Sequence, residues 1–504
     1  MLQWPPMHEH LDLEPVRGTR DYMPAEQERL IATRAALEGT LEVWGYQPVD
    51  LPVLERRELY LKKAGEELLG KLYDFVHHGR GLALRPEWTA SVLRAYLKSL
   101  QSEPLPVRLR YAGPVFRYER PQRGTYRQFT QVGVELIGGR SPRADAEVVA
   151  LACSGLRAAG VHDWTLTLGH IGVARALLAG LNLPERTASQ LLWSMERLRR
   201  GDRAALRAQL EAAGALSARD EQFDLGPLVM LPDDQLAELL ATTVRAMGLS
   251  LESTTRPPDA IIQRLIRKLR RGDPEPQIDQ ALACLERLSQ AYGEPGQALQ
   301  VARTLLDDLG LPADQLDELR AIIDLIVGQG IEFPRLVVDL GLSRGLHYYS
   351  GMLFEIEAPD GLQLCGGGRY DDLVAALNPA SAGRTQVPAV GFAYGLERVA
   401  ATTTLAVRPA GPLAMVAAPD EAYLVAMRVA HGLRARGYRV LLDARGRSVQ
   451  ANLRDAQRRG CQALIVVDDP DAGGEVVWHE LATDGRATRA RRVSVPELLH
   501  ETPV

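Results

Sequence analysis

The side chains best suited to chemistry gather between residues 117 and 138, where Arg117 and Arg127 flank a charged loop and Gln131 and Glu135 follow it. Guanidinium groups bind phosphates and carboxylates well because they donate two parallel hydrogen bonds. A solvated sheet face with ordinary cross-strand ion pairs would use the same residue types. This stretch alone therefore leaves two interpretations open, an anion-binding site and a plain polar surface.

The same stretch is predicted to form a β-hairpin that would position these side chains. Residues 107–119 and 128–137 read as two strands, and the charged loop between them contains a proline and a glycine. Side chains of a strand point alternately to its two faces, so Gln131, Gly133 and Glu135 share one face. That face is predicted to carry an amide and a carboxylate with a gap between them at the glycine.

The hairpin sequence from Arg117, Arg-Tyr-Glu-Arg-Pro-Gln-Arg-Gly-Thr-Tyr-Arg-Gln-Phe, resembles motif 2 of class II aminoacyl-tRNA synthetases and, within that class, the histidyl-tRNA synthetase family. Other stretches resemble further signatures of that family, namely residues 84–89, 344–349, 367–371 and the motif 3 segment 390–399. The resemblance implies an α+β fold. It would have a class II antiparallel sheet core with helices, a helical insertion and a C-terminal α/β domain like an anticodon-binding domain.

The resemblance also implies a role for each matching residue. ATP would be bound by Arg117, Glu119, Arg127 and Arg398. Histidine would be bound by Glu87, Thr89, Gln131, Glu135, Arg344, Tyr348 and Tyr349. Arg117 and Arg344 would be catalytic, because they would neutralise the charge that develops at the α-phosphate and the carboxylate. Magnesium would accompany the phosphates of ATP, and no protein-bound metal site is predicted.

The implied function is ligation of histidine to its tRNA. ATP and L-histidine would give histidyl-adenylate, from which the histidyl group would pass to tRNA(His). A homodimer would form through motif 1, which the helix predicted for residues 25–44 and the extended residues 46–54 resemble. The protein is expected in the cytoplasm, without contact to a membrane.

Three features resemble a paralogue instead, the regulatory subunit of ATP phosphoribosyltransferase. Trp88 stands where the synthetases have glycine, His347 stands where they have aspartate, and residues 168–172 read Leu-Gly-His-Ile-Gly. The alternative function is therefore a non-catalytic, histidine-sensing subunit that partners the catalytic subunit of ATP phosphoribosyltransferase. An indole beside the site could narrow the pocket or pack away from it. The C-terminal domain, which the regulatory paralogue typically lacks, favours the ligase.

The chain is too long for a single core, and its 504 residues are expected to form several domains. Residues 1–160 and 331–405 are predicted to form the catalytic core, 161–330 a mostly helical insertion region, and 411–504 the anticodon-binding-like domain. A helix after Pro257 has a basic face that either contacts RNA or is simply solvated. Five arginines of the last domain either contact RNA phosphates or, for some of them, simply keep a helix surface soluble: Arg445, Arg447, Arg454, Arg458 and Arg459.

Two local patterns have simple structural interpretations. Asp145 and Glu147 are interpreted as charges at the N-terminus of a helix. Three successive glycines, 366–368, are interpreted as a tight turn when the resemblance is left aside.

Composition excludes few functions. With 46% hydrophobic and 24% charged residues the chain has an ordinary globular composition. A net charge of −5 argues against nucleic acid covering the whole surface but allows a local basic patch. Four cysteines stand far apart, so neither a zinc site nor a disulfide framework is indicated, and they favour reduced thiols in the cytoplasm. No stretch is long and apolar enough to predict a membrane span.

Overall fold

The computed structural model describes residues 13–61, 70–120, 124–181, 183, 185–195, 198, 202–212, 231, 233–246, 275–330, 335–342, 348–378, 387–406, 411–470, 474–482 and 487–500. The chain divides into two compact units, Met1–Leu405 and Ala406–Val504. The two units are called here the first unit and the C-terminal unit, and each is described by itself.

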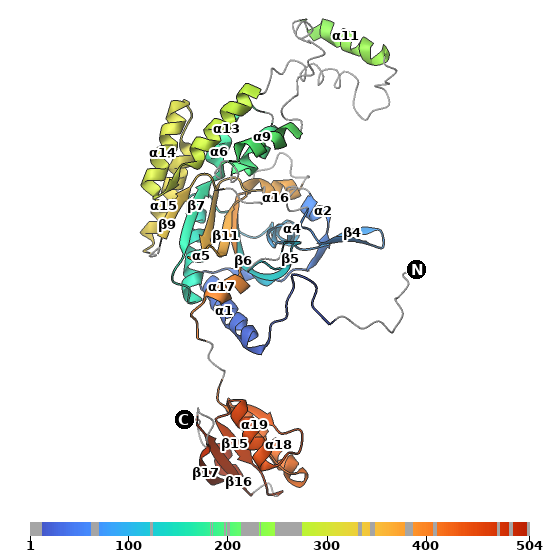
Figure 1. The fold of residues 1–504 in the computed structure, drawn as a ribbon, viewed down its shortest axis with the longest axis vertical. Helices are drawn as coiled ribbons and strands as arrows, with labels where there is room; N and C mark the ends of the chain where they lie inside the picture. Colours follow the sequence, from blue (N-terminus) through green and yellow to red (C-terminus); the bar gives the residue numbers. More distant parts are fainter. Residues whose placement is uncertain are drawn as a thin grey trace. The chain divides into compact units, whose positions relative to one another are not determined.

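A nine-stranded mixed sheet forms the centre of the first unit (Figure 1). Its order is β1 (Gln47–Pro48), β5 (Val107–Phe116), β6 (Gln128–Ile137), β12 (Ala389–Gly395), β11 (Gln363–Arg369), β10 (Met352–Glu357), β7 (Thr165–His170), β9 (Arg335–Asp339) and β8 (Tyr292–Gly293). The strands from β5 to β7 pair antiparallel, whereas β1 with β5 and β7 with β9 pair parallel. The predicted α+β class is therefore confirmed, with a sheet that is mixed rather than purely antiparallel.

The predicted hairpin is confirmed as the pair β5 and β6, in which Tyr111 lies opposite Gly133 and Leu109 opposite Glu135. Its first strand ends at Phe116, three residues earlier than expected. The N–H of Arg117 still donates to the carbonyl of Arg127 at 2.9 Å, but the chain turns directly afterwards. Arg117 and the residues after it therefore lie in a loop at the end of the strand.

The first unit also contains helices, and some of them pack on this sheet. They are α1 (Pro24–Val43), α4 (Thr89–Ser99), α5 (Arg143–Ala158), α6 (Ile171–Ala179), α7 (Glu185–Trp193), α9 (Arg203–Ala212), α11 (Asp233–Ala246), α13 (Glu275–Ser289), α14 (Pro295–Asp308), α15 (Asp314–Gly328), α16 (Asp371–Leu377) and α17 (Leu396–Thr402). The apolar residues expected to face the core from α1, Leu30, Leu37 and Leu41, are buried. A small sheet has the order β2 (Leu54–Arg56), β4 (Arg80–Leu84) and β3 (Asp74–His77), and α2 (Glu58–Leu61) follows β2.

Strand β7 corrects the expected boundary of the helical insertion. It begins within residues 161–330, yet it pairs along its whole length with β10 in the central sheet. Helix α15, at the end of the same range, packs on α5 and β7. Both ends of the range thus belong to the core of the first unit, and the finer division of this unit into a core and an insertion stays a proposal.

The triple glycine is part of a strand, so its interpretation as a tight turn is wrong. Gly366–Gly368 lie in β11 between β10 and β12. A Cβ on Gly368 would lie 2.7 Å from the carbonyl oxygen of Met352 and 2.8 Å from the Tyr349 ring, and a Cβ on Gly367 would overlap Phe392. Glycine is needed here because backbone and rings approach the strand too closely for a side chain.

The C-terminal unit is a five-stranded sheet in the order β14 (Arg439–Leu442), β13 (Leu413–Ala417), β15 (Ala463–Val466), β16 (Glu475–Leu481) and β17 (Ala487–Ser494). Strands β14, β13 and β15 pair parallel, and β16 and β17 continue the sheet antiparallel. Alternate residues of β13 pack with α18 (Tyr423–Ala435) and with α19 (Val449–Arg458), so the two helices cover opposite faces. The short η3 (Asp420–Ala422) precedes α18, and α20 (Val495–His500) follows β17.

Candidate active site

Glu135 lies at the centre of the polar face of β6 and is only 1% exposed. Its Oε1 accepts hydrogen bonds from Thr89 Oγ1 at 2.7 Å and from the Tyr111 hydroxyl at 3.2 Å. Its Oε2 accepts a hydrogen bond from the Tyr370 hydroxyl. This carboxylate is therefore held by three hydroxyl groups, which come from α4, from β5 and from the residue after β11. These groups converge because β5, β6, β12 and β11 are neighbours in that order in the sheet.

Burial raises the pKa of Glu135 to about 8, because an ionised carboxylate loses its hydration inside the protein. Hydrogen bonds from Tyr370 and Thr89 oppose this shift, and the nearby carboxylate of Glu87 adds to it. Burial also raises the pKa of the surrounding tyrosines, Tyr111, Tyr348 and Tyr370, well above its ordinary value. The tyrosines are therefore neutral hydrogen-bond donors around a carboxyl group that exchanges its proton near neutral pH.

Glu87 is a second buried carboxylate at the same place, 4% exposed. Its oxygens accept hydrogen bonds from the N–H of Ala90 at 3.0 and 3.3 Å, so it caps the N-terminus of α4. Burial raises its pKa, although the N–H groups of the helix and the Arg117 guanidinium favour the charged form. Two buried carboxyl groups with a raised pKa at one place are unusual in a purely structural core.

The other expected histidine-binding residues that the structure describes lie around these carboxylates. The ring of Tyr348 meets the ring of Tyr370 edge-on, with 5.8 Å between centroids, and the ring of Tyr349 lies 5.1 Å from that of Tyr348. Gln131 shares the strand face of Glu135, and its buried Oε1 has no hydrogen-bond partner among the described residues. A buried amide oxygen without a partner suits a ligand that donates a hydrogen bond.

Asp145 was interpreted as a charge at the N-terminus of a helix, but it also forms a buried ion pair with Arg369. It lies in the first turn of α5, but its side chain is fully buried and its Oδ2 lies 2.5 Å from Arg369 Nη2. Arg369 also lies 2.9 Å from Asp371 and donates to the carbonyl of Gly139 at 3.1 Å. This buried ion pair fixes the end of β11, one residue before Tyr370. Glu147 likewise forms an ion pair, with Arg108 at 2.8 Å.

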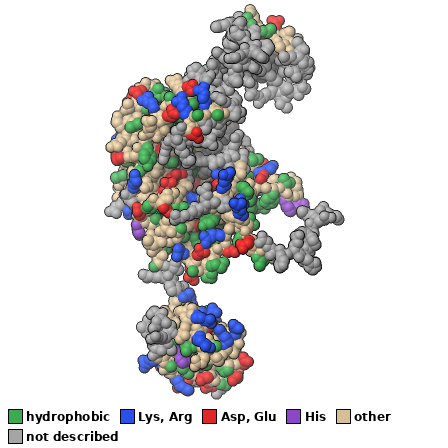
Figure 2. Space-filling view, viewed as in Figure 1, with side chains coloured by type: hydrophobic (Ala, Val, Ile, Leu, Met, Phe, Trp, Pro, Cys, Tyr) green, Lys and Arg blue, Asp and Glu red, His purple; other side chains and the backbone are tan. Residues whose placement is uncertain are grey.

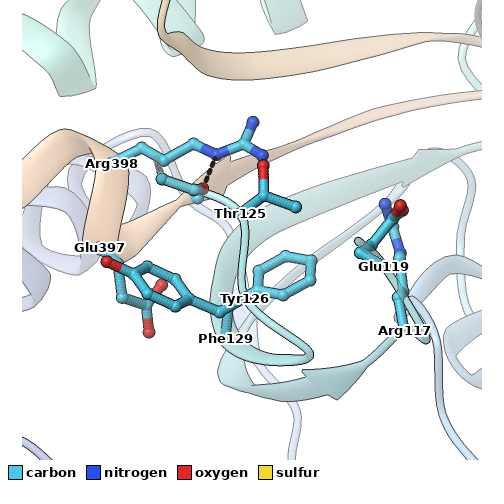
Figure 3. A pocket seen from close by; sticks show the side chains of 9 residues that line it. Arg117, Glu119, Thr125, Tyr126, Phe129, Glu397 and Arg398 are labelled. Carbon is cyan, nitrogen blue, oxygen red and sulfur yellow. Dashed lines mark hydrogen bonds between the residues drawn. The ribbon is translucent and has the colours of Figure 1, made fainter. Parts of the chain in front are cut away.

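A separate pocket lies between the end of the hairpin and the beginning of α17. It is lined by Arg117, Glu119, Gly124, Thr125, Tyr126, Phe129, Gly395, Glu397 and Arg398. Figure 3 shows Arg398 and Glu397 on one side, Arg117 and Glu119 on the other, and the rings of Tyr126 and Phe129 between them. Arg398 Nε donates to the carbonyl of Gly124 at 2.7 Å, which ties α17 to the loop of the hairpin.

Arg117 links the two parts of the site. Its Nε donates to the carbonyl of Pro86, next to Glu87, at 2.7 Å, and its guanidinium carbon lies 5.4 Å from the centre of the Phe129 ring in the pocket. Arg127 is held elsewhere, 4.0 Å above the ring of Tyr118 and packed against Gly18. The structure thus brings Arg117, Glu119 and Arg398 to one pocket and places Arg127 at its outer edge, on the N-terminal segment.

Two of the expectations fall outside the described residues. Arg344, expected to be catalytic, and His347 lie in the undescribed residues 343–347, and the basic helix after Pro257 lies in residues 247–274. Sequence reasoning also missed participants that the structure shows. Tyr370 and Arg369 belong to residues 367–371, which resemble a signature of the family, and Tyr111 would have followed from placing its strand opposite Gly133.

The arginines expected to face RNA form an ordered group in the C-terminal unit. Asp455 lies 3.0 Å from both Arg447 and Arg459 and 3.4 Å from Arg458, while Arg445 and Arg454 are exposed. Figure 2 shows basic side chains gathered on the visible face of this unit. The carboxylate of Asp455 carries a negative charge, so it lowers the net positive charge of this group of arginines.

The described residues offer no place for a metal ion and no membrane-spanning helix. They contain no cluster of three or more His, Cys, Asp or Glu side chains that could hold a metal ion. Within the same described part of the chain, no helix is long and apolar enough to cross a membrane.

Comparison with known families gives two matches. Residues 18–399 match the model of the family described as histidyl-tRNA synthetase, and residues 413–502 match the anticodon binding domain. Curated relatives include a histidine–tRNA ligase of Methanocaldococcus jannaschii, 30% identical over 93% of this chain and 95% of that protein. Another, from Archaeoglobus fulgidus, is 32% identical over 94% of this chain and 96% of that protein.

Solved structures show the same fold. A structure from Bacillus halodurans, described as an ATP phosphoribosyltransferase regulatory subunit/histidyl-tRNA synthetase, matches with a TM-score of 0.64 and 23% identity, over 92% of this chain and 100% of that chain. The histidyl-tRNA synthetase of Nostoc matches with a TM-score of 0.60 and 18% identity, over 97% and 99%.

Proposed function

This chain belongs to the histidyl-tRNA synthetase family, and from that membership we propose that it ligates L-histidine to its tRNA. In the first step a carboxylate oxygen of histidine attacks the α-phosphorus of ATP, the bond to the β-phosphate breaks, and pyrophosphate leaves. In the second step a hydroxyl of the terminal tRNA ribose attacks the carbonyl carbon of histidyl-adenylate, and AMP leaves. The protein is an enzyme that uses histidine, ATP and tRNA.

The observation that best supports this function is the buried carboxylate of Glu135 with its three hydroxyl partners. In its ionised form this carboxylate has about four acceptor sites, and three are already in use, so the ionised form can take one more N–H donor. The imidazole of histidine supplies such a donor. An amino acid without one would leave this buried acceptor unpaired, and that mismatch gives strong discrimination.

We propose that the pocket beside α17 holds ATP. Phe129 offers a flat apolar surface for the adenine ring, and the Arg398 guanidinium lies on the opposite wall as a planar cation. Arg117, which reaches from this pocket to Pro86 beside Glu87, is placed to meet both the α-phosphate and the carboxylate of histidine. It would act by holding the two reactants in line and by neutralising the developing charge.

The remaining roles follow from the family pattern. Glu119 and Arg127 would contact ATP, and Arg344 would join Arg117 at the reacting groups. Glu87 would hold the amino group of histidine, with Thr89, Gln131, Tyr348 and Tyr349 around its side chain. Magnesium would arrive with the phosphates and stabilise their charge.

The C-terminal unit would bind the anticodon region of the tRNA. Its match to the anticodon binding domain favours the ligase over a histidine-sensing subunit of ATP phosphoribosyltransferase. We also propose a homodimer formed through α1 and β1, acting in the cytoplasm.

Histidine-dependent exchange of pyrophosphate into ATP tests this function, because it reports adenylate formation without tRNA. The wild-type protein should catalyse exchange with histidine and not with other amino acids. Glu135→Gln should lose most of this activity, since the amide presents a donor where an acceptor is needed. Arg335→Gln, at an exposed position at the beginning of β9, is the control and should retain it. A folded wild-type protein that binds histidine but gives no exchange would overturn the proposal.

A further inference from the structure

Trp88 lies between two residues of the histidine site, Glu87 and Thr89, and its side chain is 1% exposed. Its indole ring stacks on the ring of Tyr111, with 4.8 Å between centroids and 10° between planes. The indole N–H donates to the carbonyl of Gly113 at 3.3 Å. The indole is thus turned toward strand β5, where it packs against the protein.

The opposite face of the indole is covered by a cation. The guanidinium carbon of Arg85 lies 3.5 Å from the ring centre, and this guanidinium donates to the carbonyls of Pro114 and Leu51, each at 2.8 Å. A Cβ at Gly113 would lie 2.8 Å from Trp88 Cζ2 and 2.9 Å from Arg85 Nη2. Arg85, Trp88 and Tyr111 therefore form a three-layer stack whose fit requires a glycine on the strand beneath it.

Tyr111 is held from the other side as well. It lies opposite Gly133, and a Cβ on that glycine would lie 2.7 Å from the Tyr111 hydroxyl. The gap expected on the polar face of the hairpin is thus filled by this phenol, whose hydroxyl donates to Glu135 Oε1. The Tyr111 ring is therefore confined between the indole of Trp88 and the space above Gly133.

We propose that Trp88 is a positioning residue for histidine selectivity. Its indole holds the Tyr111 hydroxyl on Glu135. This contact directs the remaining acceptor site of the Glu135 carboxylate to the imidazole of histidine. The inference rests on the proposed function. Thr89 and Tyr111 both occupy Oε1, and the Tyr370 hydroxyl occupies Oε2, which leaves Oε2 as the oxygen for the ligand. Without the stack Tyr111 would tilt, Oε1 would lose a donor, and the carboxylate could rotate.

A double-mutant cycle tests the coupling between Trp88 and the Tyr111 hydroxyl. Trp88→Leu, Tyr111→Phe and the double variant are compared by histidine-dependent pyrophosphate exchange. Trp88→Leu should raise KM for histidine roughly tenfold, the scale of one lost aromatic contact, with KM for ATP unchanged. The double variant should resemble Tyr111→Phe alone, since Trp88 would have no hydroxyl left to position. Trp88→Phe keeps a stacking ring and should restore a KM close to that of the wild type.

The possible outcomes separate this inference from the proposed function. Two outcomes would overturn the inference and leave Trp88 with a role in core packing alone. The first is that the two single changes in KM for histidine multiply in the double variant. The second is that Trp88→Leu leaves KM for histidine unchanged. Absence of exchange in the wild type would instead reject the ligase. Melting temperatures show whether each variant is folded. Trp88→Met has a longer, unbranched side chain that adapts to the space left by the indole, and it takes the place of Trp88→Leu if the leucine variant does not fold.

Discussion

Arg369 and Asp145 form an ion pair of 2.5 Å between β11 and α5, with side-chain exposures of only 3% and 0%. The pair is 224 residues apart in the chain. It holds the end of β11 against α5, and the next residue, Tyr370, donates to Glu135. A structural ion pair and a residue of the proposed histidine site thus occupy neighbouring positions of one strand end.

Asp145→Asn should destabilise the protein strongly, because it leaves the Arg369 charge buried with a weaker partner. We expect the free energy of unfolding to fall by about 3 kcal/mol, the scale found when one partner of a buried pair is removed. The exposed pair of Arg287 and Asp308, with exposures of 53% and 52%, is the matched control. Asp308→Asn should cost less than about 1 kcal/mol. Equal losses for the two variants, measured by urea denaturation, would contradict the structural role of Asp145.

Glu135 should make the ligand-free protein less stable as pH rises. Its pKa is raised from about 4.5 to about 8, chiefly by burial, so between these values the folded state keeps a proton that the unfolded state has lost. The free energy of unfolding then falls with rising pH, by up to about 1.4 kcal/mol per pH unit from this group. Glu135→Gln removes the contribution. Thermal unfolding of wild type and variant from pH 5 to 8 should therefore show a steeper decline for the wild type, and parallel curves would refute the assignment.

Gly391→Ala should damage both the fold and the histidine site. Gly391 lies in β12 opposite Glu135, and a Cβ there would overlap the Glu135 carboxylate and lie 2.5 Å from the carbonyl of Val134. We expect a loss of about 2 kcal/mol or more and a raised KM for histidine. Gly39→Ala is the matched control, since a Cβ at that exposed position of α1 meets nothing within 4 Å. It should be neutral or stabilise α1 by about 0.5–1 kcal/mol. An active and stable Gly391→Ala variant would show that the site is less tightly packed than described.

Asp443→Ala should impair charging of tRNA without affecting adenylate formation. This buried carboxylate accepts hydrogen bonds from the N–H of Arg447 at 2.8 Å, from Arg447 Nε at 3.1 Å and from Asn452 Nδ2 at 2.9 Å. Its loss would release the loop that presents the arginines. KM for tRNA in aminoacylation should rise, and pyrophosphate exchange should stay the same. Glu421→Ala, at an exposed position of the same unit, should change neither. A parallel loss of exchange would mean that Asp443 serves stability of the whole protein instead.

Local sequence patterns were sufficient to predict secondary-structure elements and the motifs that these elements carry. Strand alternation predicted the hairpin that the structure shows as β5 and β6. These predictions succeeded because the period of a strand or helix is a property of neighbouring residues. The family motifs likewise lie within single short stretches, so they could be read without knowledge of the pairing.

Only the tertiary structure decided which side chains meet. The partners of Glu135 lie 24, 46 and 235 residues away, and the order and register of the central sheet bring them together. Asp145 shows the same limit, because nothing in its local sequence distinguishes a helix charge from half of a buried ion pair. Trp88 could equally have entered the pocket. It packs on Tyr111 because Gly113 leaves space for the indole and Gly133 leaves space for the Tyr111 ring. Contacts of this kind depend on strand pairing between distant segments, which a local pattern does not encode.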